Sequence, residues 1–256
     1  MIEGTWEPLS PAISVLTTPQ HTFNTDTILL ASFSAPKRQD LCADLGTGCG
    51  TIPLWWAARS RPKHIWAIEL QEQAAEQAQC SVERCGLSQL ISVVQGDIRD
   101  LPSIPGMEDL HLISCNPPYQ AAGAGIPSQG QQEQLARHEF TCTLEDVARV
   151  ARRRLRWGGR LCICQRPQRL ADAMVVFREY GLEPKRLRQV QQRPEKAPFL
   201  FLLEARRGGN PGLVVEPTLF IEGTQEGLSP EMAAIYGEYR QLAGKKQEHP
   251  KGADTI

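Results

Sequence analysis

The chain has 256 residues, of which 41% are hydrophobic, and it carries a formal net charge of −1. This length suits one α/β domain with decorations, which buries roughly 70–75% of its unfolded surface. The near-neutral charge argues against a generally cationic nucleic-acid-binding protein, and no apolar run approaches the ~18–20 residues that a membrane span needs.

Two further compositional features indicate where the protein works. The N-terminal residues contain neither a basic region nor an apolar segment, so we expect no secretory signal and a cytoplasmic protein. The eight cysteines sit mostly within apolar segments rather than at metal-ligand spacings. This placement predicts reduced, buried thiols and no metal site.

Short apolar runs alternate with helical patterns through the middle of the chain, which is typical of βαβ units. We therefore expect a Rossmann-like, doubly wound α/β fold with a mostly parallel seven-stranded sheet, closed by an antiparallel C-terminal hairpin. The expected strands are 41–45, 64–69, 91–95, 110–115 and 160–164, with the hairpin formed by 183–191 and 199–205. The expected helices are 71–85, 144–157, 168–180 and 230–242, with Gly86 and Gly158-Gly159 as stops for the first two.

The same pattern divides the chain into four parts. Residues 1–40 form an N-terminal cap segment, and 41–207 form the α/β domain. Residues 208–242 form a C-terminal extension that begins in a Gly-rich and Pro-containing stretch. The composition of residues 243–256 predicts a disordered tail.

The segment Asp44-Leu45-Gly46-Thr47-Gly48-Cys49-Gly50 ends the first expected strand and forms a glycine-rich turn. Its glycines allow the backbone to approach a ligand closely, where side chains would clash. The spacing differs from the dinucleotide fingerprint. An acidic Asp44 would repel a pyrophosphate but suits a cationic sulfonium, so the turn favours S-adenosylmethionine over NAD as the cofactor.

Two more acidic residues follow the next two expected strands. Glu69 is placed to accept hydrogen bonds from both ribose hydroxyls of the cofactor. Asp97 is placed to accept one from the adenine amino group. In the alternative interpretation, each of these acids is simply a solvated loop residue. However, Asp44, Glu69 and Asp97 all fall at strand C-termini, where open α/β sheets bind ligands.

The tetrapeptide Asn116-Pro117-Pro118-Tyr119 follows the fourth expected strand and carries the candidate chemistry. A planar amino nitrogen is a poor nucleophile, because its lone pair is delocalised. The Asn116 side-chain oxygen and the Pro117 carbonyl can accept its N–H groups, which become more positive as the nitrogen turns tetrahedral. The prolines fix the backbone and cannot donate, and Tyr119 offers a ring face for a flat substrate.

Together, these motifs resemble class I S-adenosylmethionine-dependent methyltransferases. More narrowly, the chain resembles the bacterial tRNA adenine N6-methyltransferases that modify the adenine 3′ of the valine anticodon. Flanking support comes from residues 23–31, 136–139, 215–217 and 235–237, and the resemblance covers about residues 14 to 240. It implies a methyltransferase domain over 41–207, S-adenosylhomocysteine as product, and Phe23 and Asp26 at the border of the cofactor. Where relatives often carry a second aromatic residue, this chain has Gln120.

Other substrates share the tetrapeptide, because glutamine amides present the same planar nitrogen as nucleobases. The alternatives are an N5-glutamine methyltransferase acting on a release factor, and a methyltransferase of rRNA or DNA adenine. Only 43 residues precede Asp44, which we expect to be too few for the helical recognition domain of the release-factor enzymes. We therefore favour an adenine in the tRNA anticodon loop. A non-enzymatic S-adenosylmethionine-binding RNA chaperone is the remaining alternative, although it has no need of Asn116.

Basic residues in the expected hairpin are candidates for contact with RNA phosphates. They are Lys185, Arg186, Arg188, Arg193 and Lys196. A second group, between Arg149 and Arg160, lies on an expected helix and is equally well explained as a solvated face. His138 follows a loop rich in Gly and Gln and is a further substrate-site candidate. No obligate protein partner is evident, and the oligomeric state stays open.

Overall fold

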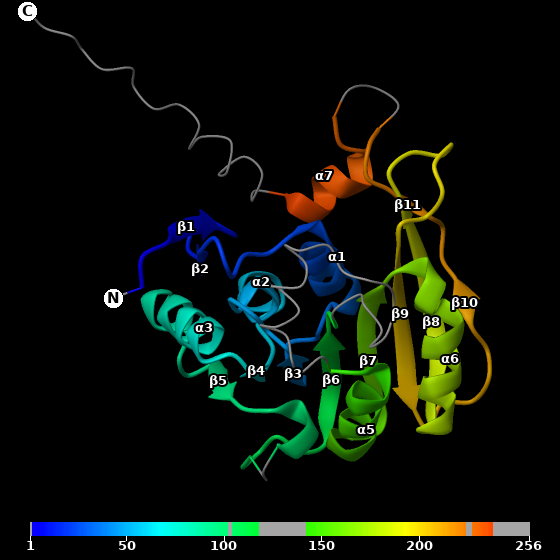
Figure 1. Cartoon of the computed structure of the whole chain (residues 1–256), viewed down its shortest axis with the longest axis horizontal. Coiled ribbons are helices and arrows are strands. Elements are labelled where there is room, and N and C mark those ends of the chain that lie inside the picture. The colour runs from blue at the N-terminus through cyan, green and yellow to red at the C-terminus, as the bar shows by residue number, and fades with distance from the viewer. Residues whose placement is uncertain (1, 102–103, 118–141, 224–226, 238–256) are drawn as a thin grey trace, which may run out of the picture.

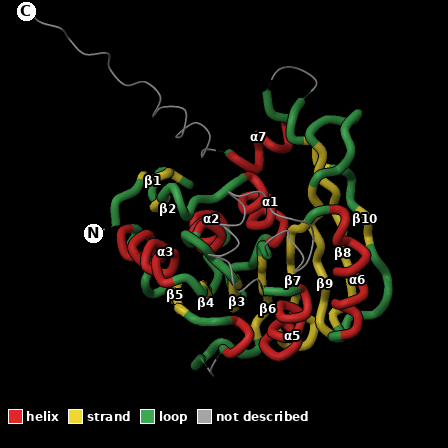
Figure 2. The backbone as a smooth tube through the Cα atoms, viewed as in Figure 1, coloured by secondary structure: helices red, strands yellow, loops and turns green. Residues whose placement is uncertain are grey.

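The protein forms a central β-sheet with helices on both faces (Figures 1 and 2). This computed structural model describes residues 2–101, 104–117, 142–223 and 227–237. The seven principal strands are β3 (Leu41–Leu45), β4 (His64–Glu69), β5 (Ile91–Gln95), β6 (Leu110–Cys115), β7 (Leu155–Gln165), β8 (Leu182–Gln191) and β9 (Leu200–Arg207). Two short strands, β10 (Val214–Val215) and β11 (Leu219–Phe220), also pair with β8.

The strand order is β10-β8-β9-β7-β6-β3-β4-β5, with β11 beside β8. Strands β3 to β7 are parallel to one another, whereas β9 is antiparallel to both β7 and β8. The direction in which successive strands are added reverses at β3, which lies between β4 and β6. These findings confirm the predicted doubly wound, mostly parallel sheet with its antiparallel hairpin.

The helices divide the hydrophobic core between the two faces of the sheet. They are α1 (Thr25–Ser34), α2 (Thr51–Arg59), α3 (Glu72–Arg84), α5 (Leu144–Arg154), α6 (Leu170–Glu179) and α7 (Pro230–Tyr236), with short 3₁₀ turns η1 (Ile98–Asp100) and η2 (Pro167–Arg169). Buried residues of α1, α2 and α3 belong to one hydrophobic cluster, called the first core cluster. Buried residues of α5 and α6 belong to the second core cluster, on the other face of the sheet. Near-continuous burial along β3, β4 and β6 follows from this double coverage.

The four strands β3 to β6 have the predicted bounds, but the junction of α5 and β7 was predicted wrongly. The helix ends at Arg154, and β7 begins at Leu155, where residues up to 157 were expected to be helical. Gly158 adopts φ +77°, and a Cβ at Gly159 would lie 2.7 Å from the Leu110 carbonyl oxygen. These glycines therefore serve an irregular, close pairing of β7 with β6 rather than a helix stop.

Helix α7 is shorter than expected, and the N-terminal segment contains elements that were not predicted. The helix ends at Tyr236 because Gly237 takes a positive φ of 50°. Near the N-terminus, β1 (Thr5–Pro8) and β2 (Ser14–Thr17) form an antiparallel pair. The Ser81 hydroxyl oxygen of α3 accepts the Leu16 N–H of this pair over 2.9 Å. The cap segment is thereby tied to the α/β domain.

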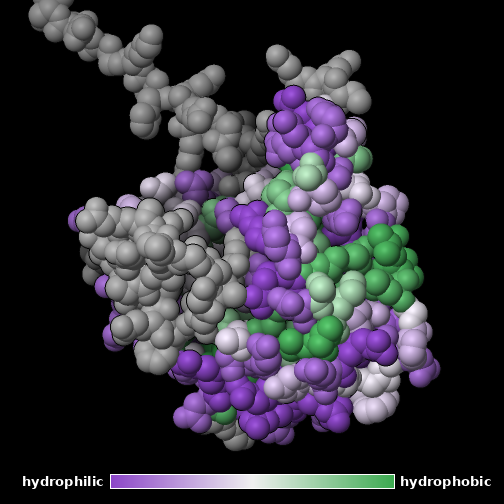
Figure 3. All heavy atoms as spheres, turned by 45° about the vertical axis from the view of Figure 1, so that its right-hand side comes forward, coloured by the Kyte–Doolittle hydropathy of each residue, from purple (hydrophilic) through white to green (hydrophobic). Residues whose placement is uncertain are grey.

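The C-terminal extension joins the sheet rather than leaving it. Strands β10 and β11 run parallel to β8, and β10 ends the sheet on that side. Val214 and Val215 of β10 are 59% and 63% exposed. Figure 3, which turns this side forward, shows hydrophobic atoms gathered among hydrophilic ones there. The buried Leu219 of β11 and Met232 of α7 attach the extension to the first core cluster.

Candidate active site

The parallel strands deliver the predicted polar residues to one edge of the sheet. Asp44 lies in β3, Glu69 ends β4, and Asn116 follows β6 directly. The register pairs Leu45 with Ile68 on one side and with Cys115 on the other. Because carboxyl ends of adjacent parallel strands meet at one edge, the acids and the amide come from neighbouring strand ends.

The glycine-rich turn leaves open space beside its backbone. Gly46 and Gly48 adopt φ values of +70° and +56°, and a Cβ at either would meet no atom within 4 Å. The N–H groups of Gly46 and Thr47 both donate to the Ile68 carbonyl oxygen over 2.9 Å. Gly50, at φ +83°, caps α2 and packs against Ala78. The turn is therefore held against β4 while its glycines face a space that a ligand can fill.

Glu69 is buried, and each of its carboxylate oxygens already accepts one backbone hydrogen. Oε2 accepts the Gly48 N–H over 2.8 Å, and Oε1 accepts the Gln71 N–H over 2.9 Å. A carboxylate oxygen has two lone-pair sites, so one remains on each oxygen. The carboxylate can therefore fix the turn and also accept two adjacent hydroxyl donors.

Asp44 is a buried carboxyl group with one oxygen unsatisfied. Oδ1 accepts the Ser114 hydroxyl hydrogen over 2.5 Å, whereas Oδ2 has no hydrogen-bond partner among the described residues. Burial raises the pKa of Asp44 to about 7, the Ser114 and Thr47 hydroxyls oppose this increase, and the charge of Glu69 adds to it. The Thr47 hydroxyl lies close enough to act on the Asp44 carboxyl group, but Oγ1 is buried and makes no hydrogen bond of normal geometry with a described residue. Two orphaned buried polar atoms beside an open glycine turn are suited to a polar, cationic ligand.

Asp97 follows β5 at the same edge but is already engaged by a neighbour. Its carboxylate caps η1 by accepting the Arg99 N–H, and it forms an ion pair with the Arg99 guanidinium. The Arg99 hydrogen bond lowers the pKa of Asp97. Any amino group of a ligand would therefore share this carboxylate with Arg99.

The two residues carried over from the resemblance lie at the start of α1. Phe23 is partly buried and packs against the first core cluster. Asp26 is buried in the first turn of the helix, which Asn24 caps by accepting the Thr27 N–H. Their contact with a cofactor stays a prediction.

The described part of the catalytic tetrapeptide consists of Asn116 and Pro117. Oδ1 of Asn116 accepts a hydrogen bond from the Cys164 thiol at 2.9 Å, and Pro117 is buried. Pro118, Tyr119 and His138 lie outside the described residues. The predicted acceptor oxygen thus stands at the end of β6, next to the cradle formed by β3 and β4.

The predicted RNA-binding residues occupy both ends of β8. Lys185 and Arg186 lie near its start, whereas Arg193 and Lys196 lie in the turn after its end. Because β8 and β7 both pair antiparallel with β9, they run in the same direction. The turn therefore lies at the edge of the sheet that carries Asn116, as the hairpin in Figure 1 shows.

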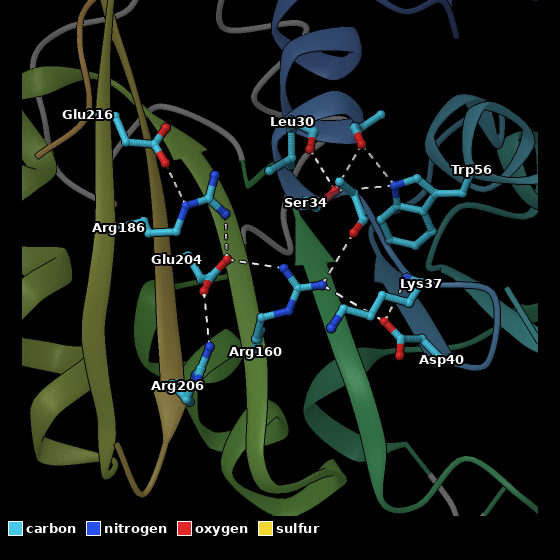
Figure 4. A network of polar contacts seen from close by, with 12 residues as sticks. Leu30, Ser34, Lys37, Asp40, Trp56, Arg160, Arg186, Glu204, Arg206 and Glu216 are labelled. Carbon is cyan, nitrogen blue, oxygen red and sulfur yellow. Dashed lines mark hydrogen bonds and ion pairs between the residues drawn. The ribbon is translucent and has the colours of Figure 1, made fainter. Parts of the chain in front are cut away.

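Most of these basic side chains already have partners. Arg186 pairs with Glu204 and Glu216, and Glu204 also pairs with Arg160 (Figure 4). Two further arginines pair with acids of the C-terminal extension: Arg188 with Glu231, and Arg193 with Glu222. Lys185 donates to the Asn210 carbonyl oxygen over 3.0 Å, and Lys196 is exposed. The hairpin therefore presents a less positive surface than its sequence suggests.

Two residues that contact the site were not predicted from the sequence. Ser114 bonds Asp44, and Cys164 bonds Asn116. Arg166, which was also not predicted, donates to the Phe199 carbonyl oxygen over 3.0 Å and so holds the hairpin to the end of β7. A polar residue inside the apolar strand 110–115 was the one available signal for Ser114. The contact of Cys164 depends on strand register, which the sequence pattern does not fix.

Comparison with known proteins places the chain among methyltransferases. Residues 23–180 match the family described as "Methyltransferase small domain". A relative from Porphyromonas gingivalis, named tRNA1(Val) (adenine(37)-N6)-methyltransferase, is 34% identical to this chain. The alignment covers 71% of this chain and 73% of the relative's length. A relative of the same name from Tolumonas auensis is 30% identical over 84% of this chain and 88% of its own.

Solved structures show the same fold. A predicted O-methyltransferase from Agrobacterium tumefaciens superposes with a TM-score of 0.66 at 24% identity, covering 84% of this chain and 97% of that one. The Pyrococcus horikoshii NSun6 structure, solved with SFG, gives a TM-score of 0.56 at 17% identity, covering 73% of this chain and 53% of that one. In the described part of the chain, no helix is both long and apolar enough to cross a membrane.

Proposed function

Because this chain belongs to the methyltransferase small domain family, we propose that it transfers a methyl group from S-adenosylmethionine to the N6 amine of an adenine in tRNA. The target lies in the anticodon loop, and S-adenosylhomocysteine is the second product. The names of the relatives at 34% and 30% identity support this substrate. A tRNA substrate implies that the enzyme works in the cytoplasm.

The chemistry of the cradle fits S-adenosylmethionine. That cofactor supplies an electrophilic methyl group on a positively charged sulfur. Asp44 offers the cation a buried carboxylate oxygen that has no hydrogen-bond partner among the described residues. Glu69 accepts one described backbone N–H on each oxygen, which leaves a second lone-pair site on each for the ribose hydroxyls. The open space at Gly46 and Gly48 admits the ligand next to the backbone. Asp97 accepts the adenine amino group while keeping its bond to Arg99.

Asn116 and Pro117 carry the proposed catalysis. Their oxygens accept the two N6 hydrogens of the target adenine and hold its nitrogen in line with the methyl group. The amine gains positive charge as it attacks and the bond from methyl to sulfur breaks, so these acceptors bind the transition state more tightly than the ground state. The methylated amine then releases one N6 proton to water. Pro118 and Tyr119 complete the proposed site, with the Tyr119 ring stacking on the base.

One observation supports this assignment more than any other. The Asp44 carboxylate, whose Oδ2 has no hydrogen-bond partner among the described residues, lies in β3, and the Asn116 amide follows β6. These two strands pair directly, with Leu45 opposite Cys115. A methyl donor held at the first residue therefore lies beside the acceptor group at the second. A binding protein without turnover has no need of this second group, which disfavours the chaperone alternative.

The tRNA-binding surface is proposed to lie on the β8–β9 hairpin. Arg193 and Lys196 stand at the edge of the sheet that carries Asn116, where an anticodon loop would enter. Lys185, Arg186 and Arg188 extend this surface along β8, and His138 is proposed to contact the substrate. An anticodon-loop adenine is already partly unstacked, so flipping it out costs less than the few kcal/mol required in a duplex.

The test compares substrate classes directly. The purified chain is incubated with labelled S-adenosylmethionine and with total tRNA, rRNA, DNA or release factors in separate reactions, and digested products are identified by mass spectrometry. We expect N6-methyladenosine in tRNA, and Asn116→Ala should abolish it while cofactor binding persists. N5-methylglutamine in a release factor, or label in rRNA or DNA only, would reject the tRNA assignment. Cofactor binding without methylation of any pool would favour the chaperone.

A further inference from the structure

The buried thiol of Cys164 donates a hydrogen bond to the proposed catalytic amide of Asn116. The Cys164 sulfur lies 2.9 Å from Oδ1 of Asn116. Strands β6 and β7 are parallel, and Cys115 pairs with Ile163, so residue 164 stands opposite residue 116. The backbone register therefore creates this contact, which does not depend on a long, adjustable side chain.

We propose that Cys164 is a positioning residue that fixes the Asn116 amide for methyl transfer. This inference rests on the function proposed above, in which Oδ1 of Asn116 accepts a hydrogen from the target amine. Oδ1 has two lone pairs, and the thiol hydrogen occupies one acceptor site. With the oxygen anchored on one side, rotation of the amide that would present its NH2 group to the substrate is disfavoured.

The surroundings of the thiol make this role effective. Cys164 is 0% exposed, so water does not compete for the bond, whereas Asn116 is partly exposed. A thiol is also a weak donor, so it orients the oxygen without strongly reducing its capacity as an acceptor. Acceptor geometry matters because small misplacements of a catalytic group reduce rates strongly.

Cys162 provides a matched control on the same strand. It is also 0% exposed, lies two residues earlier on the same face, and belongs to the same core cluster. Its pKa is raised to about 12, chiefly by burial, so it stays a neutral thiol. Replacing either cysteine with alanine removes one buried sulfur, but only Cys164 bonds Asn116.

The kinetic test uses the full chain with tRNA as substrate. We expect Cys164→Ala to lower kcat three- to tenfold, where tenfold corresponds to about 1.4 kcal/mol, and to leave KM for S-adenosylmethionine unchanged. Cys164→Ser keeps a donor, although its shorter C–O bond reaches less far, and should retain more activity than the alanine variant. Cys162→Ala should lower Tm to a similar extent without changing kcat. Wild-type kcat in Cys164→Ala, or an equal loss in Cys162→Ala, would overturn the proposal.

A second measurement needs no turnover and so separates the two proposals. The side-chain NH2 signals of Asn116 are assigned by NMR through their loss in Asn116→Asp. In the wild-type protein and in Cys164→Ser we expect one ordered set of signals. In Cys164→Ala we expect shifted signals with lower order. Unchanged signals in Cys164→Ala would reject the positioning role, whereas absence of methylation by the wild-type protein would reject only the proposed function.

Discussion

Ser114 donates its hydroxyl hydrogen to Oδ1 of Asp44 over 2.5 Å, across the register pair that joins β6 to β3. This hydrogen bond satisfies Oδ1 of the buried Asp44 carboxyl group. The other oxygen, Oδ2, has no hydrogen-bond partner among the described residues and is proposed to bind the cofactor. Burial still dominates, so the pKa of Asp44 is about 7 rather than the ordinary 3.8. The strand that carries the proposed catalytic amide thus also tunes the proposed cofactor carboxylate.

The raised pKa predicts that cofactor binding depends on pH. Below pH 7 the Asp44 carboxyl group is mostly neutral, so a cationic ligand must displace its proton. We expect the affinity for S-adenosylmethionine to fall by up to about tenfold per pH unit below 7. Calorimetry at pH 6 in buffers of different ionisation enthalpy should detect proton release. The Asp44→Asn variant should bind weakly with no such dependence, and Ser114→Ala should move the midpoint to higher pH. A flat wild-type profile between pH 5.5 and 7.5 would contradict this mechanism.

The same group predicts how stability without cofactor changes with pH. Its pKa is raised in the folded state, so the unfolded state ionises first as pH increases from 3.8 to 7. The contribution of Asp44 to stability is therefore fully present at low pH and is lost as pH rises through this window. We expect Asp44→Asn to be more stable than the wild-type protein at pH 8, by ~1–3 kcal/mol, and to lose this advantage near pH 4. Urea unfolding of both proteins across this range provides the measurement, and a constant difference would refute the pKa assignment.

Glycine substitutions can separate backbone strain from ligand exclusion. Gly48 and Gly86 have φ values of +56° and +66°, and a Cβ at either meets no atom within 4 Å. Alanine at each position should cost about 1 kcal/mol of stability, because both require a left-handed backbone. Only Gly48→Ala should weaken S-adenosylmethionine binding, by more than tenfold, because only its Cβ enters the proposed cradle. Equal binding by the two variants, measured by calorimetry, would place the cofactor elsewhere.

Glu69 has two roles that a single substitution should reveal. Its carboxylate accepts the Gly48 N–H and is proposed to accept the ribose hydroxyls. Glu69→Gln replaces one carboxylate oxygen with an NH2 group, which can only donate. This group would then face another donor, either a backbone N–H or a ribose hydroxyl. We expect KM for S-adenosylmethionine to rise ~10–100-fold with a smaller change in kcat. A variant with normal KM would remove Glu69 from the cofactor site.

The sequence was sufficient for those parts of the molecule that depend on local pattern. Strands β3 to β6 have the predicted bounds, because each is a short, mainly apolar run, and β3, β4 and β6 are buried on both faces. Glu69 and Asn116 followed as strand-end residues. The α5–β7 junction failed because Gly158 and Gly159 resemble a helix stop but serve an irregular strand pairing. Ser114 and Cys164 meet their partners across 70 and 48 residues of sequence. Such contacts depend on register and packing, which composition and periodicity do not determine.

The ion pairs of the hairpin were not predictable for the same reason. Arg186, Arg188 and Arg193 formed a basic cluster in the sequence, but their acidic partners come from β9 and from the C-terminal extension. The number of basic residues in this stretch therefore overstates the positive charge that the hairpin offers to RNA.

Charge reversal at the two ends of β8 tests where RNA binds. Lys196 is exposed in the turn at the edge that carries Asn116, whereas Lys185 lies near the opposite end of β8. If tRNA enters at the proposed edge, Lys196→Glu should raise KM for tRNA several-fold and reduce the slope of log affinity against log salt by about 0.7–0.9 per lost phosphate contact. Cofactor affinity should stay unchanged. Lys185→Glu is the matched comparison, with the same charge change, and should have the smaller effect. A larger effect of Lys185→Glu than of Lys196→Glu would mean that the tRNA approaches from the other end of β8, and would reject entry over the hairpin turn.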